Sequence, residues 1–399
     1  MKQGWELKTL GDVCSVQRGL TYSGKDTVDY SSTVVLRATN IDLDSSSLVF
    51  DELKYLRDDF EIKEKYELKK GSLLICFSSG SKSHLGKVAL VDKHYKYAFG
   101  GFIGQITPSN NIDPKYLFYS LISEDYKSYI AQLTDGVNIN NLKIKDLQGF
   151  QIPVPPLEEQ KQIVAKLDQC FEAIDKAKAN AAKNLENAKE LFQSKLNDIF
   201  SQKGEGWVEK KLGDVCSLIG GGTPSKKNKQ FYTGDILWAT VRDMKLDVIT
   251  QTECSITKEA VSKSSTNIIP KGNVIIATRV GLGKVCLINQ DTAINQDLRG
   301  VIPKEKSDLQ VKYLFWWFKS ISKLIINEGT GATVQGVKLP FVKSLNIPIP
   351  TTASQSNIVA LLDTLQEQTQ SLESKYQQEL NSLEELKKSI LQKAFEGEL

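Results

Sequence analysis

The sequence has very few of the side chains from which most catalytic and metal sites are built. Its 399 residues include only two histidines, His84 and His94. A histidine-dependent catalytic triad or a multi-histidine metal site is therefore not expected. No two cysteines have the Cys-x-x-Cys spacing, which excludes the usual zinc motifs, and a disulfide framework is not expected in a chain of this size. The six cysteines stand apart as Cys14, Cys76, Cys170, Cys216, Cys254 and Cys286.

Long hydrophobic runs and a strong charge of one sign are also missing. The most apolar window, Val311–Phe318, is much shorter than a membrane span. The first residues contain no apolar stretch of signal-peptide length. We therefore expect a cytoplasmic protein with no membrane partner. The formal net charge of +3 permits nucleic-acid binding but does not argue for it, because a phosphate-binding surface needs local clustering of cations.

What the chain does have is an internal repeat of about half its length. Equivalent segments recur 195 to 202 residues apart. This period is too long for one turn of a solenoid and predicts two copies of one globular domain. Cys14 and Cys216 occupy the same position of the repeat, where we expect a small buried side chain. The matching pairs are Trp5–Ser15 with Trp207–Ser217, Lys70–Ile75 with Lys271–Ile276, Gly86–Val91 with Gly283–Ile288, Lys115–Phe118 with Lys312–Phe315, and Ile152–Pro155 with Ile347–Pro350.

A long helical pattern follows each copy. From Leu157 to about Phe200 apolar residues step by four and three, and adding 195 to each position gives the second pattern. This seven-residue period over more than four heptads is typical of a coiled-coil seam. A helix of about 44 residues extends roughly 65 Å. We expect antiparallel packing, with Leu372 and Tyr376 beside the alanine-rich middle of the first helix. Packing of each helix on its own domain, or on another protein, is the alternative.

These patterns predict an α+β fold. It consists of two homologous α/β domains, two long antiparallel coiled-coil helices and an internal pseudo-two-fold axis. Such a chain has two similar surfaces, which suits a target with two parts. The predicted boundaries are 1–155 for the first domain, 156–203 for the first helix, 204–351 for the second domain and 352–399 for the second helix.

Within the domains, short apolar runs predict strands and two amphipathic stretches predict helices. Helices are expected at Pro114–Tyr129 and Asp308–Ile326. The predicted strands are Thr33–Arg37, Ser72–Cys76, Lys87–Val91 and Phe102–Ile106, with counterparts at Ile236–Ala239, Asn273–Ala277, Lys284–Ile288 and Leu298–Ile302.

The loops after matched strands differ between the copies. Residues 37–42 and 238–243 follow the first matched strand, and residues 77–86 and 278–283 connect the next two. One scaffold with two sets of polar and basic loops suits two readers of different DNA sequences, because Arg binds guanine, Asn binds adenine and Lys binds phosphate. The alternative for each residue is an ordinary solvated loop, and Arg37 can equally be tied to its own scaffold. The candidate DNA contacts are Arg37, Asn40, Lys82 and His84 in the first copy and Arg242, Lys245 and Arg279 in the second.

Two segments are close to enzymatic motifs without matching them. Gly80–Val88 has the glycines and lysine of a phosphate-binding loop, but its spacing is one residue too long and Val88 replaces the Ser or Thr. Glu61-Ile-Lys63 is similar to the end of the acidic motif of metal-dependent nucleases. It lies in a charge-rich stretch without a counterpart in the second copy, so a solvated charged face explains it better. We therefore expect no catalytic residue, no metal and no cofactor on this chain.

Several landmarks occur in a fixed order along the chain. They are Trp5…Leu10-Gly-Asp-Val13 and Trp207…Leu212-Gly-Asp-Val215 at the domain starts, Leu36–Ile41, Ala293–Pro303 and Phe150–Gln160. Together they resemble the specificity subunit of type I restriction–modification systems, over essentially the whole chain. The opening of the second helix, Pro350-Thr-Thr-Ala-Ser-Gln355, departs from the Pro-Leu-Glu-Glu pattern at 156–159 and leaves its start open.

By this resemblance, each domain reads one half of a split, asymmetric site in double-stranded DNA. The helices set the unread gap and dock two methyltransferase subunits. S-adenosylmethionine, ATP and Mg²⁺ are expected on the methyltransferase and restriction subunits and not on this chain. Two alternatives stay open: a similar subunit of another DNA-methyltransferase or phage-defence complex without a nuclease, and a coiled-coil scaffold that does not bind DNA. The residues do not reveal the half-site sequences or the length of the gap.

Overall fold

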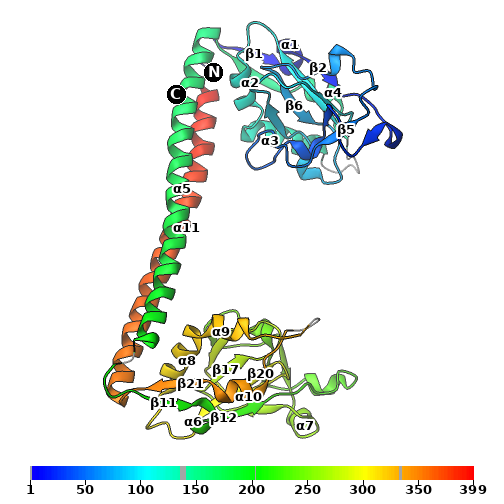
Figure 1. Ribbon diagram of the computed structural model, residues 1–399. Coiled ribbons are helices and arrows are strands. Elements are labelled where there is room, and N and C mark those ends of the chain that lie inside the picture. The colour runs from blue at the N-terminus through cyan, green and yellow to red at the C-terminus, as the bar shows by residue number, and fades with distance from the viewer. Residues whose placement is uncertain (1, 135–140, 203, 332–334) are drawn as a thin grey trace. The chain divides into compact units, whose positions relative to one another are not determined.

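The computed structural model describes residues 2–134, 141–202, 204–331 and 335–399. The chain folds into two compact units: the first combines residues 1–181 with 378–399, and the second spans 182–377. Each unit contains one α/β domain and one part of each of two long helices, α5 (Leu157–Ser201) and α11 (Thr352–Glu396) (Figure 1). The predicted α+β fold with two domains and two long helices is confirmed.

The first domain contains two larger sheets and a short strand pair among its described residues. The sheets have the strand orders β2-β9-β6-β7 and β3-β5-β4-β8, and β1 pairs with β10 across the two ends of the domain. The strands are β1 Glu6–Thr9, β2 Cys14–Arg18, β3 Thr27–Val28, β4 Thr33–Leu36, β5 Lys54–Leu56, β6 Leu73–Cys76, β7 Val88–Leu90, β8 Tyr97–Phe99, β9 Ile103–Pro108 and β10 Gln151–Val154. The helices are α1 Leu10–Val13, α2 Pro114–Ser120, α3 Glu124–Thr134 and α4 Ile144–Gln148, with 3₁₀ turns η1 Gly24–Asp26, η2 Ala38–Asn40, η3 Glu64–Tyr66 and η4 Lys82–His84.

The second domain repeats most of this topology, but among its described residues it has no counterpart of β3 and has two further edge strands, β14 and β16. Its described sheets have the orders β12-β20-β17-β18-β14 and β15-β13-β19-β16, and β11 pairs with β21. The strands are β11 Val208–Lys211, β12 Cys216–Gly220, β13 Ile236–Ala239, β14 Val248–Ile249, β15 Cys254–Ile256, β16 Asn267–Ile269, β17 Val274–Ala277, β18 Val285–Ile288, β19 Thr292–Ile294, β20 Leu298–Pro303 and β21 Asn346–Ile349. The helices are α6 Leu212–Val215, α7 Lys258–Ser262, α8 Val311–Ser320, α9 Ser322–Asn327 and α10 Leu339–Ser344, with 3₁₀ turns η5 Lys229–Tyr232 and η6 Val241–Asp243.

One central strand in each domain separates two hydrophobic layers. Leu73 and Ile75 of β6 join the core formed with α2 and α3, whereas Leu74 and Cys76 join the core between the two sheets. The four residues of β17 divide in the same way. Successive side chains of a strand point to opposite faces, so a strand buried on both faces is a continuous apolar run. This explains why these two segments are the clearest strand predictions in the sequence.

In the first unit, the start of α5 and the end of α11 run side by side next to the first domain (Figure 1). Their directions are opposite, because Asp175 pairs with Lys387 (3.1 Å) and the later residue Lys178 pairs with the earlier Glu384 (2.6 Å). Phe395, near the end of α11, packs on the Tyr116 ring of α2, with centroids 5.2 Å apart. The predicted antiparallel helix pair is confirmed in this unit.

In the second unit the two helices exchange roles. Here the start of α11 and the end of α5 pack against the second domain, and Leu196 and Leu362 are buried in its core. Phe200 of α5 lies on Tyr313 of α8 with ring centroids 5.3 Å apart. Phe200 precedes Phe395 by 195 residues, which is the repeat period of the helices. The two units are therefore built in the same way from equivalent residues.

Both helices predicted within the domains differ from the structure, and seven of the eight predicted strands differ by one or two residues at one or both ends. Each predicted helix is two helices: α2 and α3 are separated at residues 121–123, where the Ser123 hydroxyl accepts from the Tyr126 N–H (3.3 Å), and α8 and α9 are separated at Ile321. The predicted strand 102–106 begins one residue later, at Ile103. Phe102 consequently lies outside the sheet.

The helix pair also differs from the prediction at several positions of the seam, since Leu191 and Leu386, which the seven-residue period places there, are 62% and 47% exposed. Leu372, expected in the seam, is 43% exposed. Thr369 and Tyr376, which are one heptad apart, are the partly buried residues here, so the inward stripe of α11 passes beside Leu372. No helix in the described ranges has the combination of length and apolar character that crossing a bilayer requires.

A buried glutamine connects each domain to the long helix that follows it in the sequence. The Gln160 amide of α5 donates to the carbonyl oxygens of Asn111 (3.0 Å) and Pro155 (2.9 Å) and accepts from the Asp113 N–H (2.8 Å). Gln355 makes the equivalent three bonds at the start of α11. Both side chains are fully buried. Because every polar atom of the amide is used, the orientation of the helix on its domain is well defined.

We expect Gln160→Ala to weaken this joint. The substitution removes the partner of two carbonyl groups and one N–H in a buried or partly buried joint, at a cost of about 3 kcal/mol. In hydrogen-exchange mass spectrometry, the segment around Asp113 should exchange roughly 100-fold faster than in the parent protein. Gln162→Ala, an exposed glutamine one position past Lys161, is the matched control and should leave exchange unchanged. Equal exchange in both variants would show that Gln160 does not hold the joint.

The cysteines differ strongly in their environment. Cys14 and Cys216 are buried, as the sequence predicted. Burial raises the pKa of both thiols to about 12, and that of Cys286 also to about 12. The thiolate is the reactive form, so these groups are almost fully unreactive near neutral pH. Cys254 is exposed.

We therefore expect Cys254 to react first when native protein is alkylated with iodoacetamide at pH 8. Cys14 and Cys216 should label at least about 100-fold more slowly, because both burial and a raised pKa protect them. Peptide mapping of a labelling time course measures the order. Protein unfolded in guanidinium provides the control, since all six thiols should label there at similar rates. Early labelling of Cys14 in native protein would contradict the placement of its strand.

Candidate nucleic-acid interface

Both domains have a hollow at the same place in the fold. Strand pairing defines the equivalence, because Leu36 of β4 lies opposite Phe99 of β8 and Ala239 of β13 lies opposite Ile294 of β19. Arg37, directly after β4, lines the first hollow, and the turn η6 after β13 lines the second. The residues just before β9 or β20 form another wall. The hollow measures about 270 Å³ in the first domain and about 560 Å³ in the second.

A glycine allows two segments to meet at this place in each domain. A Cβ atom on Gly19 would lie 2.3 Å from the Gly100 carbonyl oxygen, and one on Gly221 would lie 2.1 Å from that of Asn295. Neither distance is tolerable for a side chain, so only glycine permits the approach. The same close contact in both copies keeps the two hollows geometrically alike.

The turn behind each hollow is held by a polar side chain. Asn40 accepts from the Arg37 N–H (2.8 Å) and donates to the carbonyl oxygens of Val49 (3.0 Å) and Glu52 (3.2 Å). Asp243 holds η6 in the same position of the second domain. Asn40 is only 1% exposed. It therefore serves the fold in this conformation, and we leave it out of the proposed DNA surface.

Arg37 lines the first hollow together with Tyr22. Its guanidinium makes a long contact from Nη2 to the Glu52 carbonyl oxygen (3.4 Å), and its buried Nε has no hydrogen-bond partner among the described residues. Burial raises the pKa of Tyr22, and the nearby Arg37 charge acts in the opposite direction. Arg37 thus has only a weak tie to its own scaffold, and its Nη groups, unlike the buried Nε, are the donors available to a ligand.

The second hollow has a more polar lining. Trp238 and Tyr232 form one side, with ring centroids 5.8 Å apart, and each donates a hydrogen bond to a backbone carbonyl group. Thr223 donates a hydrogen bond to Gln296 across the hollow. Lys226 also lines it. Rigid aromatic side chains with amide, hydroxyl and cationic groups at their edge are suited to base and phosphate contacts.

Arg242 lines this hollow, and Lys245 lies three residues further along the chain. Their side chains are 82% and 73% exposed and lie 4.0 Å and 3.9 Å from the Glu253 carboxylate. Exposed ion pairs of this length contribute little free energy. Both cations can therefore leave Glu253 for a phosphate group or a base at little cost.

Arg279 comes from the loop after β17 and pairs with Asp297 at 3.8 Å. Asp297 lines the same hollow as Arg242. The neighbouring Val280 has a φ of 46°, a strained conformation for a β-branched residue, and its N–H donates to the Gln335 carbonyl oxygen (3.3 Å). The loop is therefore held in one shape, with Arg279 at its edge.

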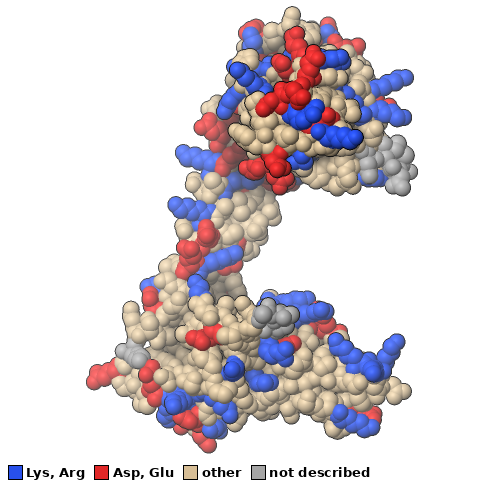
Figure 2. Space-filling model, turned by 45° about the vertical axis from the view of Figure 1, so that its right-hand side comes forward, with Lys and Arg blue, Asp and Glu red and all other residues tan. Residues whose placement is uncertain are grey.

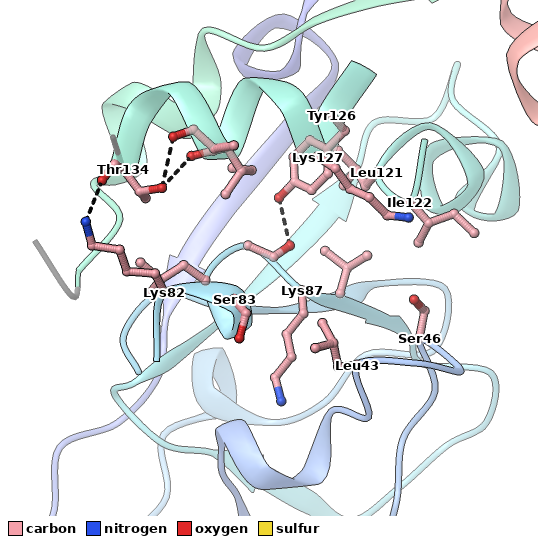
Figure 3. Close-up of a pocket in the computed structure, with 15 residues that line it drawn as sticks. Leu43, Ser46, Lys82, Ser83, Lys87, Leu121, Ile122, Tyr126, Lys127 and Thr134 are labelled. Carbon is pink, nitrogen blue, oxygen red and sulfur yellow. Dashed lines mark hydrogen bonds between the residues drawn. The ribbon is translucent and has the colours of Figure 1, made fainter. Parts of the chain in front are cut away.

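Lys82 and His84 lie elsewhere in the first domain. Lys82 lines an apolar groove of about 400 Å³, with Leu43 and Ser46 on one side and Leu121 and Ile122 on the other (Figure 3). Its Nζ donates to the Thr134 carbonyl oxygen (3.1 Å). His84 is partly exposed at the end of η4. The structure thus brings Arg242 and Arg279 to one hollow, whereas Arg37 and Lys82 line two different ones.

On the face that Figure 2 shows, the positive charges of the second domain's described residues do not form one continuous patch. On the face of the second domain visible in Figure 2, lysine and arginine side chains are spread over several places. Among the described residues, no group of three or more His, Cys, Asp or Glu side chains could hold a metal ion. Glu61 and Lys63 are exposed.

Comparison with known proteins decides what this pair of domains is. The family model for the type I restriction modification DNA specificity domain matches residues 2–184 and again 204–382. The chain belongs to this family. It is a specificity subunit of the type I restriction–modification kind and carries two target-recognition domains.

Relatives of this family match along the whole chain. The type I restriction enzyme StySPI specificity subunit of Salmonella potsdam is 27% identical over 100% of this chain and 90% of its own length. The EcoKI specificity subunit of Escherichia coli K12 is 25% identical with the same coverage. Among solved structures, the HsdS subunit of Thermoanaerobacter tengcongensis has a TM-score of 0.65 at 21% identity, covering 100% of this chain and 98% of that one. That likeness supports the fold.

The strand register shows residues of this specificity subunit that sequence matching missed. Aligning identical letters places Arg37 opposite Trp238, but the strand pairs place it opposite Thr240, two residues further on. In the same way Phe102 corresponds to Asp297 and not to Leu298, because Pro108 and Pro303 hold equivalent positions. A one-residue shift moves a side chain to the opposite face of a strand. The register adds Phe102, Thr223, Lys226 and Gln296 to the candidate surface.

Proposed function

We propose that this subunit binds a bipartite DNA site and that each domain reads one half through the edge of its hollow. The single observation that supports this most is the pair of equivalent hollows with different linings. Arg37 and Tyr22 line the first, and Lys226, Arg242 and Gln296 line the second. Arg and Gln bind guanine and adenine edges in the major groove, and Lys binds phosphate. Two readers with different side chains imply an asymmetric target.

We assign the reading function to residues 1–155 and 204–351 and the spacing function to residues 156–203 and 352–399. The proposed contacts include Arg37 at the first hollow and Arg242, Lys245 and Arg279 in the second domain. Lys82 and His84 of η4, which lie away from the first hollow, are proposed as additional contacts of the first domain. Half-sites one DNA turn apart are separated by about 34 Å. A continuous 45-residue helix, roughly 67 Å long, is long enough to span this distance. The buried Gln160 and Gln355 joints supply the stiffness that a spacer requires.

The same proposal assigns catalysis to partner subunits. Apolar side chains remain exposed on the long helices at Leu191, Leu361, Leu372 and Leu386. Exposed apolar residues on a polar helix favour protein contacts, and we propose that two methyltransferase subunits dock there. The partners would supply S-adenosylmethionine and, with restriction subunits, ATP and Mg²⁺, so this chain acts without a cofactor of its own. The DNA target implies a cytoplasmic location.

The test is a band-shift experiment with the full chain co-expressed with the methyltransferase subunit of the same host. We expect the complex to retain a small set of genomic fragments that share two short motifs at one fixed separation. Retention without any common motif would contradict the proposal and favour a scaffold that does not read DNA. Adding restriction subunits distinguishes a restriction–modification complex, which cleaves unmodified DNA, from a complex that only methylates.

A further inference from the structure

Phe102 is a large apolar side chain that the fold leaves in solvent. It is 71% exposed, just before β9. Its main chain is firmly held, because the Phe102 carbonyl oxygen accepts from the N–H groups of Phe77 (2.9 Å) and Ser78 (3.0 Å). The ring is thus presented from a fixed backbone without being part of a core, and its exposure contributes nothing to folding.

The second domain provides an internal comparison for this position. Asp297 takes the place of Phe102, and its carbonyl oxygen accepts from the N–H groups of Thr278 (2.8 Å) and Arg279 (3.2 Å) in the same pattern. The scaffold therefore accepts an acidic residue as readily as an aromatic one. The choice of phenylalanine in the first domain reflects what this surface contacts and not what the fold requires.

The recess beside Phe102 is correspondingly apolar. Gly100 and Gly101 stand where the second domain has Asn295 and Gln296, so bare backbone replaces two amide side chains. Leu20 and Thr21 complete the wall, and the volume is about 270 Å³. A Cβ atom on Gly101 would lie 3.3 Å from the Leu20 carbonyl oxygen, so a side chain there would narrow the recess. An apolar recess beside an exposed ring fits a small apolar group.

DNA offers one such group on a base edge. The C5-methyl of thymine is the apolar feature of the major groove, and phenylalanine is one of the side chains that contact it. Arg37 lines the same recess, and the long contact from its Nη2 to the Glu52 carbonyl oxygen (3.4 Å) can be exchanged for one to a neighbouring phosphate group or base. The positive charge of Arg37 and the apolar surface of the recess thus lie side by side. A base edge and its neighbouring phosphate group require this combination.

We propose that Phe102 reads a thymine methyl group in the half-site of the first domain, which rests on the proposed function. Phe102 is then a specificity-determining residue, and the first half-site contains at least one A·T pair at a position that the second domain cannot read in this way. The second domain, with Asp297 and Gln296 at the places of Phe102 and Gly101, selects polar base edges.

The experiment removes the methyl group from the DNA and the ring from the protein. The complex with its methyltransferase is titrated with duplexes of its mapped site in which each thymine of the first half-site is replaced in turn by deoxyuridine. One replacement should weaken binding about fourfold, the equivalent of one buried methyl group. Phe102→Ala and Phe102→Asp should bind the thymine and deoxyuridine duplexes equally well. Tyr30→Ala removes another exposed aromatic of the first domain and should keep the fourfold difference.

The outcomes separate this inference from the proposed function. Selective binding of the bipartite site with no effect of any deoxyuridine, or with the same effect in Phe102→Ala, overturns the role of Phe102 and leaves the two-reader function intact. A first half-site without an A·T pair has the same consequence. Absence of selective DNA binding by the parent complex overturns the proposed function, and the inference falls with it.

Discussion

A subunit with seven residues inserted into both long helices will direct methylation to a site with the same two half-sites and a longer gap. The insertion points are the boundaries of the two compact units, between Ala181 and Ala182 in α5 and between Gln377 and Gln378 in α11. Insertion there leaves the contacts within each unit intact. Seven residues turn the helix by nearly two full revolutions, so the direction of the apolar stripe is almost unchanged.

The expected size of the change follows from helix and DNA geometry. Seven residues add roughly 10 Å of helix, which corresponds to about 3 base pairs of duplex. Three base pairs also rotate one half-site by about 100° around the DNA axis. The seven inserted helix residues do not produce a rotation of this size between the two domains. We therefore expect the longer site to be bound more weakly than the original site is bound by the parent protein. Methylation of the original sites should fall below detection.

Methylome sequencing of a host that expresses the insertion variant with its methyltransferase measures the gap directly. A variant with seven residues inserted into α5 alone is the control, because it misaligns the helix pair and should methylate neither site. If the double insertion leaves the gap unchanged, the helices do not set the spacing.

Replacing Arg242 and Arg279 together by alanine should remove recognition of the second half-site. Both side chains lie at one hollow, and the ion pair that each makes with another described residue is 3.8 Å or longer. A good base contact by arginine is worth about 1–3 kcal/mol, so the double substitution should weaken specific binding roughly 100-fold. The preference for the first half-site should persist.

Binding assays with both half-site variants measure this effect. Lys258→Ala combined with Lys271→Ala removes two exposed cations of the same domain that do not line the hollow, so it controls for net charge. A uniform loss across all sequences with a smaller salt dependence would identify the arginines as phosphate contacts. Unchanged affinity in the arginine variant would show that this hollow does not face DNA.

The repeat made the architecture predictable. Identical segments such as Trp5–Ser15 and Trp207–Ser217 predicted two domains, and the seven-residue period predicted α5 with nearly the observed ends, Leu157 and Ser201. In strongly periodic segments, the local pattern of apolar residues is enough to predict the secondary structure. Strands buried on both faces, such as β6, were also predictable because they are continuous apolar runs.

The candidate site was less predictable, since it depends on register and on contacts between distant residues. Asn40 is of a residue type that often contacts DNA bases, yet it is buried and its side chain stabilises its own turn. Phe102 was read as part of a strand because a one-residue shift in matching the copies conceals its correspondence to Asp297. Arg242 and Arg279 are separated by 37 residues, and only the fold shows that they approach one hollow.

The most direct measurement of the central claim is the methylation map of a host whose other methyltransferases have been deleted. We predict one asymmetric motif of two short specified halves separated by a fixed number of unspecified base pairs. Exchanging residues 1–155 for the corresponding domain of a relative should change one half of that motif and leave the other half and the gap as they were. A continuous motif, or a domain exchange that alters both halves, would contradict the reading of DNA by two separate domains.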